Sequence, residues 1–186
     1  MQKYSVEKFI NATLFFAERV EKLGPTKLNK LLYFSDFEHF RLYGRPILGD
    51  QYIKMEQGPV PQSSYNLFNA NFRDNIDSSL KQSFEVEPEL TLTFWRKCIK
   101  PKQTADLSVF SESEIKVMEG VAEKFKDSFA TDLSRKSHDE KPWKDTPAMS
   151  VIDYKLGLDQ PDSLSTDYAG YHEEQDKLLE KMLNEP

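Results

Sequence analysis

The fold depends most on one stretch of the sequence, Lys30-Leu31-Leu32-Tyr33-Phe34-Ser35-Asp36-Phe37-Glu38-His39. It lies inside a longer pattern that predicts a helix from about Thr26 to Tyr43. On a helical wheel, apolar and aromatic side chains cover nearly the whole circumference of this helix. Charge is confined to a narrow strip that consists of Lys27, Lys30, Glu38 and Arg41. A helix that is apolar almost all round lies in a core, so we predict a buried central helix.

Further helices are predicted on both sides of this segment. Ser5 is a suitable N-cap for a first helix, because the residues that follow it repeat with a helical period. Gln62–Phe72 carries aromatic residues along one side and also reads as a helix. The clearest helix runs from Ser111 to Ala130, and it opens with a capping box of Ser111 and Glu114.

Short strands are predicted between these helices. Gln51–Glu56 and Leu90–Trp95 alternate between polar and apolar residues, and Arg96–Lys100 is read as a further strand. Gly58-Pro59-Val60-Pro61 is poor in backbone donors and reads as a rigid turn. Residues 134–143 read as a polar loop that ends in tryptophan. The predicted fold is α+β and mostly α-helical, with a buried central helix, surrounding helices and a small antiparallel sheet.

The length of 186 residues corresponds to one ordinary domain. We assign that domain to residues 1–146 and treat residues 147–186 as a C-terminal extension. The extension ends in a charged helix, Tyr171–Asn184, with a thin apolar stripe. We expect this helix to pack on the same domain, although it could also dimerise or dock on a partner.

Composition limits the function classes. The formal net charge of -6 argues against nucleic-acid binding, because such proteins usually carry a basic surface. The chain has one cysteine, Cys98, which leaves no internal disulfide and no cysteine-rich metal site. No apolar run reaches the length of about 18 residues that a bilayer requires, and the first residues are not those of a signal peptide. We expect a cytoplasmic protein without a membrane partner.

Several short blocks occur in a characteristic order. They are Lys30 to His39, Tyr43-Gly44-Arg45-Pro46, Gly49-Asp50, Gly58-Pro59-Val60-Pro61, Ser137-His138 and Pro142-Trp143. Together these blocks resemble the Panacea domain of SocA-like antitoxins from type II toxin–antitoxin systems. The resemblance implies a bacterial or phage antitoxin that binds and neutralises a cognate protein toxin. Some relatives deliver their partner to a bacterial protease, so a proteolytic adaptor is the second hypothesis.

Five residues of these blocks are predicted to form a structural polar network: Asp36, His39, Arg45, His138 and Trp143. Buried ionisable groups are costly unless they are hydrogen-bonded, and polar networks commonly fix how elements dock. A competing hypothesis joins His39 and His138 with a carboxylate in a metal-dependent hydrolase. We favour the structural network. We assign no catalytic residue, metal or cofactor, and we expect a protein that is not an enzyme.

Candidate partner-binding residues are Tyr33, Gly58, Pro59, Val60 and Pro61. A rigid loop on a scaffold is a common place for a binding surface. The glycine and proline run could equally be a turn that ends a strand, and the sequence leaves this alternative open.

Overall fold

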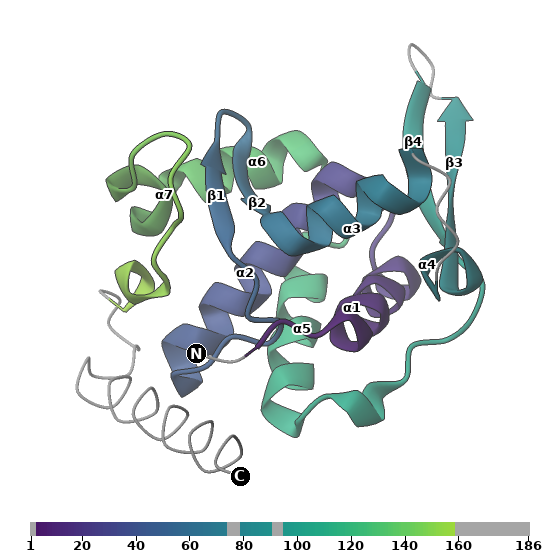
Figure 1. The fold of residues 1–186 in the computed structure, drawn as a ribbon, viewed down its shortest axis with the longest axis horizontal. Coiled ribbons are helices and arrows are strands. Elements are labelled where there is room, and N and C mark those ends of the chain that lie inside the picture. The colour runs from purple at the N-terminus through teal and green to yellow at the C-terminus, as the bar shows by residue number, and fades with distance from the viewer. Residues whose placement is uncertain (1–2, 74–78, 91–94, 159–186) are drawn as a thin grey trace, which may run out of the picture.

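Seven α-helices and two small antiparallel sheets make up the described part of the chain (Figure 1). The structure is a computed structural model that describes residues 3–73, 79–90 and 95–158. The helices are α1 (Val6–Arg19), α2 (Pro25–Tyr43), α3 (Gln62–Arg73), α4 (Ser79–Ser83), α5 (Glu112–Phe125), α6 (Ala130–Asp139) and α7 (Lys141–Asp145), with 3-10 turns η1 (Leu107–Val109) and η2 (Tyr154–Gly157). The strands are β1 (Tyr52–Met55), β2 (Gly58–Pro61), β3 (Phe84–Leu90) and β4 (Trp95–Pro101). The predicted mostly helical α+β fold is confirmed.

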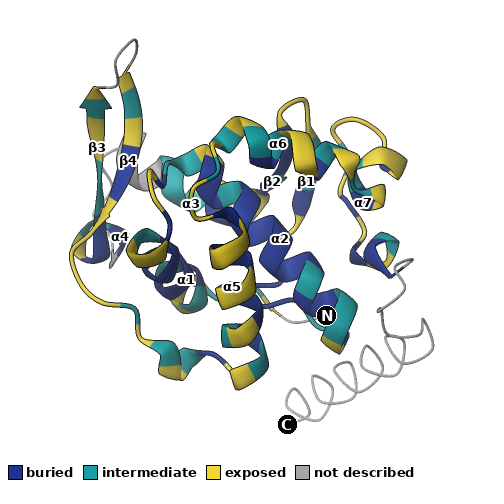
Figure 2. Cartoon of the chain, turned by 180° about the vertical axis from the view of Figure 1, so that it is seen from behind, coloured by how far each residue is buried: buried dark blue, intermediate teal, exposed yellow. Residues whose placement is uncertain are grey.

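Helix α2 runs through the centre of the molecule and is buried over most of its length (Figure 2). It contacts α1, α5, α6 and β2. Pro25 lies in its first turn, where a missing N–H costs nothing. Gly44 ends it in the left-handed conformation, with φ of 73°. The predicted buried central helix is therefore confirmed.

Two lysines of the predicted charged strip are not at the surface. Lys27 and Lys30 are only 2% and 1% exposed. The Lys27 ammonium donates to the carbonyl oxygens of Glu21 and Lys126, at 2.9 and 3.1 Å. Backbone oxygens can satisfy a buried ammonium while its aliphatic stem packs among apolar side chains, which the helical wheel does not reveal.

The segment Gly58–Pro61 is strand β2 and not a turn, which corrects the prediction. It pairs antiparallel with β1, and Ile53 lies opposite Val60. The chain reverses at Glu56-Gln57 instead. Proline is tolerated in a strand whose outer side has no partner, because its missing N–H then removes no ladder hydrogen bond.

A later segment completes this sheet on the other side of β1. The amide of Ile152 donates to the carbonyl of Tyr52 at 2.8 Å, and Lys54 donates to Ser150 at 2.9 Å. Val151 forms an isolated antiparallel bridge with Ile53. The β1–β2 hairpin is therefore enclosed between the body of the protein and residues from beyond the predicted domain boundary at 146.

The second sheet begins earlier than predicted. Strand β3 covers Phe84–Leu90 and pairs with β4, so that Leu90 lies opposite Trp95. The predicted strand at Arg96–Lys100 is confirmed as part of β4. The predicted single strand Leu90–Trp95 is wrong, because Leu90 ends β3 and Trp95 begins β4; residues 91–94 lie outside the described residues. Strand β3 was missed because alternating glutamates and Pro88 lower its apparent strand propensity.

Helix α5 begins with the predicted capping box. The Ser111 hydroxyl accepts from the Glu114 amide at 3.3 Å, and the Glu114 carboxylate accepts from the Ser111 amide at 2.8 Å. The helix ends at Phe125, earlier than the predicted Ala130, because the chain turns there.

The predicted polar loop at 134–143 is helical, which corrects that assignment. Residues 134–139 belong to α6 and residues 141–143 to α7, with Glu140 between the two helices. Leu133 and Ser137 are buried and lie four positions apart, so they face the core together. The polar residues between them belong to the solvent face of a helix rather than to a loop.

Residues after 146 continue along the same body as far as Leu158. Ile152, Tyr154 and Leu158 are buried in the core. The predicted final helix, Tyr171–Asn184, lies outside the described residues. Among the residues that are described, no helix has the length and apolar character needed to cross a bilayer.

Candidate functional site

Asp36 lies fully buried where α2 meets β1 and η2. Its Oδ1 accepts the amides of Ile47 and Leu48, at 2.9 and 2.7 Å. Its Oδ2 accepts the hydroxyls of Tyr52 and Tyr154, both at 3.1 Å. Burial raises the pKa of Asp36 to about 7, although the hydrogen bonds from Leu48 and the two tyrosines act in the opposite direction. This carboxyl group joins three separate parts of the chain.

A second buried carboxylate, Asp50, was assigned no role of its own from the sequence. It accepts the amides of Ser63 and Ser64 at 2.8 Å, and so caps the start of α3. It also accepts the Ser64 hydroxyl at 2.7 Å, and its own carbonyl accepts the hydroxyl of Tyr154 at 2.7 Å. Tyr154 thus links Asp50 to the Asp36 network. The Gly49-Asp50 block is the feature of the sequence that could have indicated this role for Asp50.

His39 connects α2 to the following loop and to α5. Its Nδ1 donates to the carbonyl of Arg45, and its Nε2 accepts the hydroxyl of Ser113 at 3.0 Å. Burial lowers the pKa of His39, which favours the neutral imidazole in which Nε2 is the acceptor. The ring also packs against Tyr43, with centroids 4.8 Å apart. The structure therefore brings together His39 and Arg45 of the predicted polar network.

His138 and Trp143 form a separate cluster on α6 and α7. Their rings stack with centroids 4.0 Å apart, and Lys54 Nζ lies 4.1 Å from the Trp143 centroid. Burial and the nearby Lys30 lower the pKa of His138. The hydrolase hypothesis needs His39 and His138 in one site. His39 instead contacts Arg45 and Ser113, whereas His138 stacks on Trp143. In the described ranges, no three His, Cys, Asp or Glu side chains are grouped to hold a metal.

Lys30 and Gly58 form a close contact that the sequence did not predict. The buried Lys30 ammonium donates to the carbonyl of Pro59 at 2.7 Å. Burial lowers the pKa of Lys30 to about 7. Gly58 has φ of 96°, and a Cβ there would lie 2.6 Å from Ser137 Oγ and 2.8 Å from Lys30 Cε. The glycine allows α2, α6 and β2 to approach one another.

The outward face of the β1–β2 hairpin is apolar. Opposed residues of an antiparallel pair share a face, so Ile53 and Val60 lie side by side, and Val151 flanks Ile53. Val151 and Met55 are 51% and 37% exposed, and Met149, whose amide bonds to a β1 carbonyl, is 70% exposed. We name this surface the hairpin patch and define it as Ile53, Met55, Val60, Met149 and Val151.

The candidate partner-binding residues are distributed unevenly between core and surface. Tyr33 is fully buried, and its ring packs 4.4 Å from that of Phe37. Gly58, Pro59 and Pro61 are also buried, whereas Val60 is partly exposed in the hairpin patch. Partner binding by these five residues stays a prediction, and Val60 is the one that a partner could reach directly.

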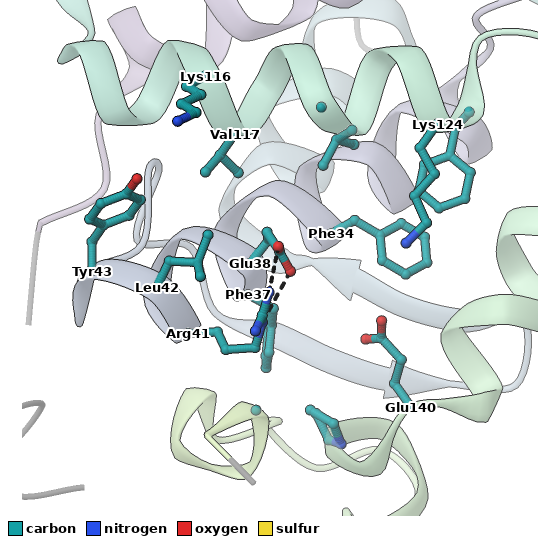
Figure 3. A pocket seen from close by; sticks show the side chains of 15 residues that line it. Phe34, Phe37, Glu38, Arg41, Leu42, Tyr43, Lys116, Val117, Lys124 and Glu140 are labelled. Carbon is teal, nitrogen blue, oxygen red and sulfur yellow. Dashed lines mark hydrogen bonds and ion pairs between the residues drawn. The ribbon is translucent and has the colours of Figure 1, made fainter. Parts of the chain in front are cut away.

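A groove of about 570 Å³ lies between α2 and α5, with α7 and η2 at one end (Figure 3). Its apolar lining includes Phe34, Phe37, Val117, Val121 and Phe125. Its charged lining consists of Glu38, Arg41, Lys116, Lys124 and Glu140. Burial raises the pKa of Glu140, opposed by the nearby Tyr33 hydroxyl. No sequence motif pointed to this groove, because it arises only when the two helices meet.

Comparison with known families assigns the chain. The family model for the antitoxin SocA-like Panacea domain matches residues 28–144. The matched range includes Asp36, His39, His138 and the β1–β2 hairpin, whereas Tyr154 of the Asp36 network follows it. Searches of curated proteins and of solved structures gave no match. Since the matched range covers more than half of the sequence, the chain belongs to the SocA-like antitoxin family with the Panacea domain.

Proposed function

We propose that this protein neutralises a cognate toxin by direct, stoichiometric binding in the bacterial cytoplasm. The observation that carries the proposal is the family match over residues 28–144. An antitoxin family suggests a toxin partner and a role without catalysis. In this proposal Asp36 and His39 hold the fold together, and exposed side chains contact the toxin.

The hairpin patch is our candidate for the centre of the toxin interface. Exposed apolar side chains on a fixed backbone are typical of binding surfaces, and interface centres are usually poor in charge. Val60 lies within the matched range, while Met149 and Val151 follow it. A specific interface usually buries about 1,600 Å² in total, so neighbouring polar residues would form its rim.

The backbone beneath this patch is well anchored. Strand β2 is held by the bond from Lys30 to Pro59, and β1 is held by its pairing with residues 150–152. A surface that is ordered before binding loses little conformational entropy when the partner arrives. Such preorganisation supports tight neutralisation by a small number of apolar contacts.

The test is co-expression with each neighbouring open reading frame, with growth and complex formation as readouts. We expect one neighbour to be toxic alone and harmless together with this chain. Val60→Asp should weaken the complex at least about 30-fold, because a buried charge at an interface centre costs on the order of 2 kcal/mol or more. The matched control is Trp95→Asp, since Trp95 is 67% exposed on the other hairpin.

Three outcomes count against the proposal. If neither neighbour is toxic, or if co-expression fails to rescue growth, an antitoxin role is refuted. If Trp95→Asp abolishes binding and Val60→Asp does not, the hairpin patch is the wrong surface. If the toxin disappears in a protease-dependent manner instead of forming a stable 1:1 complex, the protein is a proteolytic adaptor.

A further inference from the structure

Among its described lining residues, the groove between α2 and α5 has an excess of positive charge, with three cations and two carboxyl groups. Lys116 and Lys124 are exposed on α5, and neither takes part in an ion pair within the described ranges. On the opposite wall Glu38 and Arg41 neutralise each other at 2.6 Å. The fifth charge is the half-buried Glu140; burial raises its pKa, whereas the nearby Tyr33 hydroxyl and Lys124 lower it, so Lys124 has a partial counter-charge and Lys116 has none from this residue. An acidic occupant would complement this surface.

The α5 wall also has room for an occupant. Lys116, Gly120 and Lys124 are spaced four residues apart, so they form one strip along the helix. A Cβ built on Gly120 would have no heavy atom within 4 Å. Figure 3 shows Lys116 and Lys124 beside the hollow, across from Glu38 and Arg41. Apolar side chains such as Val117 and Val121 line the groove between the charges.

The sequence of this chain contains a complementary segment. Residues 159–186 hold eight acidic and two basic side chains, so they account for the whole formal net charge of -6. The apolar stripe predicted for Tyr171–Asn184 includes Leu178, Leu179 and Met182. Acidic residues around an apolar stripe match a groove that is basic at its rim and apolar at its floor.

The point where the described chain ends also favours this segment. Residue 158 follows directly on Gly157, which lines the groove. The connector of residues 159–170 can span up to about 40 Å when extended, far more than the roughly 12 Å between Lys116 and Lys124 along α5. A tethered segment has an effective concentration in the millimolar range, so weak contacts suffice to keep it bound.

We propose that the acidic C-terminal segment, residues 159–186, docks in the groove between α2 and α5 of its own chain. Carboxylates of the segment face Lys116 and Lys124, and its leucines and methionine cover the apolar floor. The docking weakens as ionic strength rises, because exposed charge pairs are screened by salt. This contact is independent of toxin binding at the hairpin patch.

The test is hydrogen–deuterium exchange of the full chain, read by mass spectrometry at the amides of residues 171–184. The variant Lys116→Glu/Lys124→Glu reverses the charge of the groove at exposed positions. The matched control, Lys97→Glu/Lys100→Glu, makes the same charge change on exposed residues of β4. We expect exchange at 171–184 to accelerate at least tenfold in the groove variant and to stay at the wild-type rate in the control.

A steric variant provides a second readout. Gly120→Trp places a large side chain in the groove at a position where a Cβ meets no heavy atom within 4 Å. We therefore expect faster exchange at residues 171–184 and an unchanged melting temperature. Equal exchange in wild type and groove variants would overturn the docking, and so would equal acceleration in the β4 control. Protection that vanishes on dilution would overturn docking within one chain, because it would assign the segment to the groove of a second copy.

Discussion

The two hairpins differ in a way that their lengths do not predict. Strands β1 and β2 have four residues each, yet Tyr52, Pro59 and Pro61 are buried. Strands β3 and β4 have seven residues each, and they project from the body with Leu90 and Trp95 more than 60% exposed (Figure 1). The comparison shows that anchoring by other elements, rather than strand length, determines how deeply a hairpin is embedded.

The anchors of the two hairpins are chemically different. The β1–β2 hairpin is held by two buried side chains: Asp36 accepts a hydrogen bond from Tyr52 of β1, and Lys30 donates one to the carbonyl of Pro59 in β2. The β3–β4 hairpin is fixed at its base, where the amide of Ile99 donates to the carbonyl of Leu23 at 2.7 Å. Farther out, its charged side chains pair at the surface, where ion pairs contribute little. Buried anchors should therefore dominate the stability.

The largest expected effect is that of Asp36→Ala. It leaves the amides of Ile47 and Leu48 and the hydroxyl of Tyr52 without their acceptor in the core, while the Tyr154 hydroxyl keeps the Asp50 carbonyl. Unfolding in urea should show a loss of about 4 kcal/mol or more, because each unsatisfied buried group costs roughly 1–3 kcal/mol. The control is Glu89→Ala, which removes a surface carboxylate that pairs with Arg96 in the other hairpin. Similar losses for both variants would contradict the comparison.

Gly58→Ala should destabilise the protein by about 2–4 kcal/mol, as measured by the midpoint of unfolding. The left-handed backbone costs a side chain roughly 1–2 kcal/mol, and the clash of its Cβ with Ser137 and Lys30 adds to this. Gly120→Ala is the matched control. It lies in a helix with open space around it, so alanine should stabilise the protein by about 0.5–1 kcal/mol. If Gly58→Ala leaves the stability unchanged, the neighbouring Ser137 and Lys30 side chains can move to make room for the added Cβ.

Lys30→Met should alter the pH dependence of stability. The pKa of Lys30 is about 7 when folded and 10.5 when unperturbed, so the unfolded chain binds more protons between these values. The free energy of unfolding of the wild type should therefore rise with pH, by up to about 1.4 kcal/mol per pH unit. Denaturation at pH 7.5 and 9 should show this rise in the wild type and in Lys97→Met, but not in Lys30→Met. If the free energy of unfolding still rises with pH in Lys30→Met, another titrating group causes the rise.

The smallest effect is expected for Trp95→Ser. Its ring is 67% exposed at the end of β4, so little contact is lost when it is replaced. The free energy of unfolding should change by less than about 0.5 kcal/mol, as for most surface substitutions. A loss of several times this value would mean that the β3–β4 hairpin is anchored beyond its base.

The sequence predicted the elements whose patterns are strong and local. The central helix, its glycine end and the capping box of Ser111 need only neighbouring residues to be recognised. Strand β3 and helix α6 were missed because glutamates and other polar residues on their solvent faces concealed the pattern. Local periodicity cannot show which face of such a segment will meet the core.

The candidate site was predicted less completely, for a different reason. Asp36 was expected to be buried, because it lies on an apolar helix face. Its partner Tyr154 is 118 residues away, and no local rule joins the two. The burial of Lys30 was also missed, since lysine side chains are almost always exposed and only the folded chain places the Pro59 carbonyl beside it.

The proline-rich strand β2 has a consequence for how this molecule can associate. Pro59 and Pro61 offer no N–H, and the carbonyl of Pro59 is already bonded to Lys30. On the far side of β1 the neighbouring position is filled by residues 150–152. The outer edge of β2 therefore lacks N–H groups for strand addition, and the outer edge of β1 is already covered. A partner that recognises this hairpin is therefore expected to contact side chains across its face rather than to extend β1 or β2.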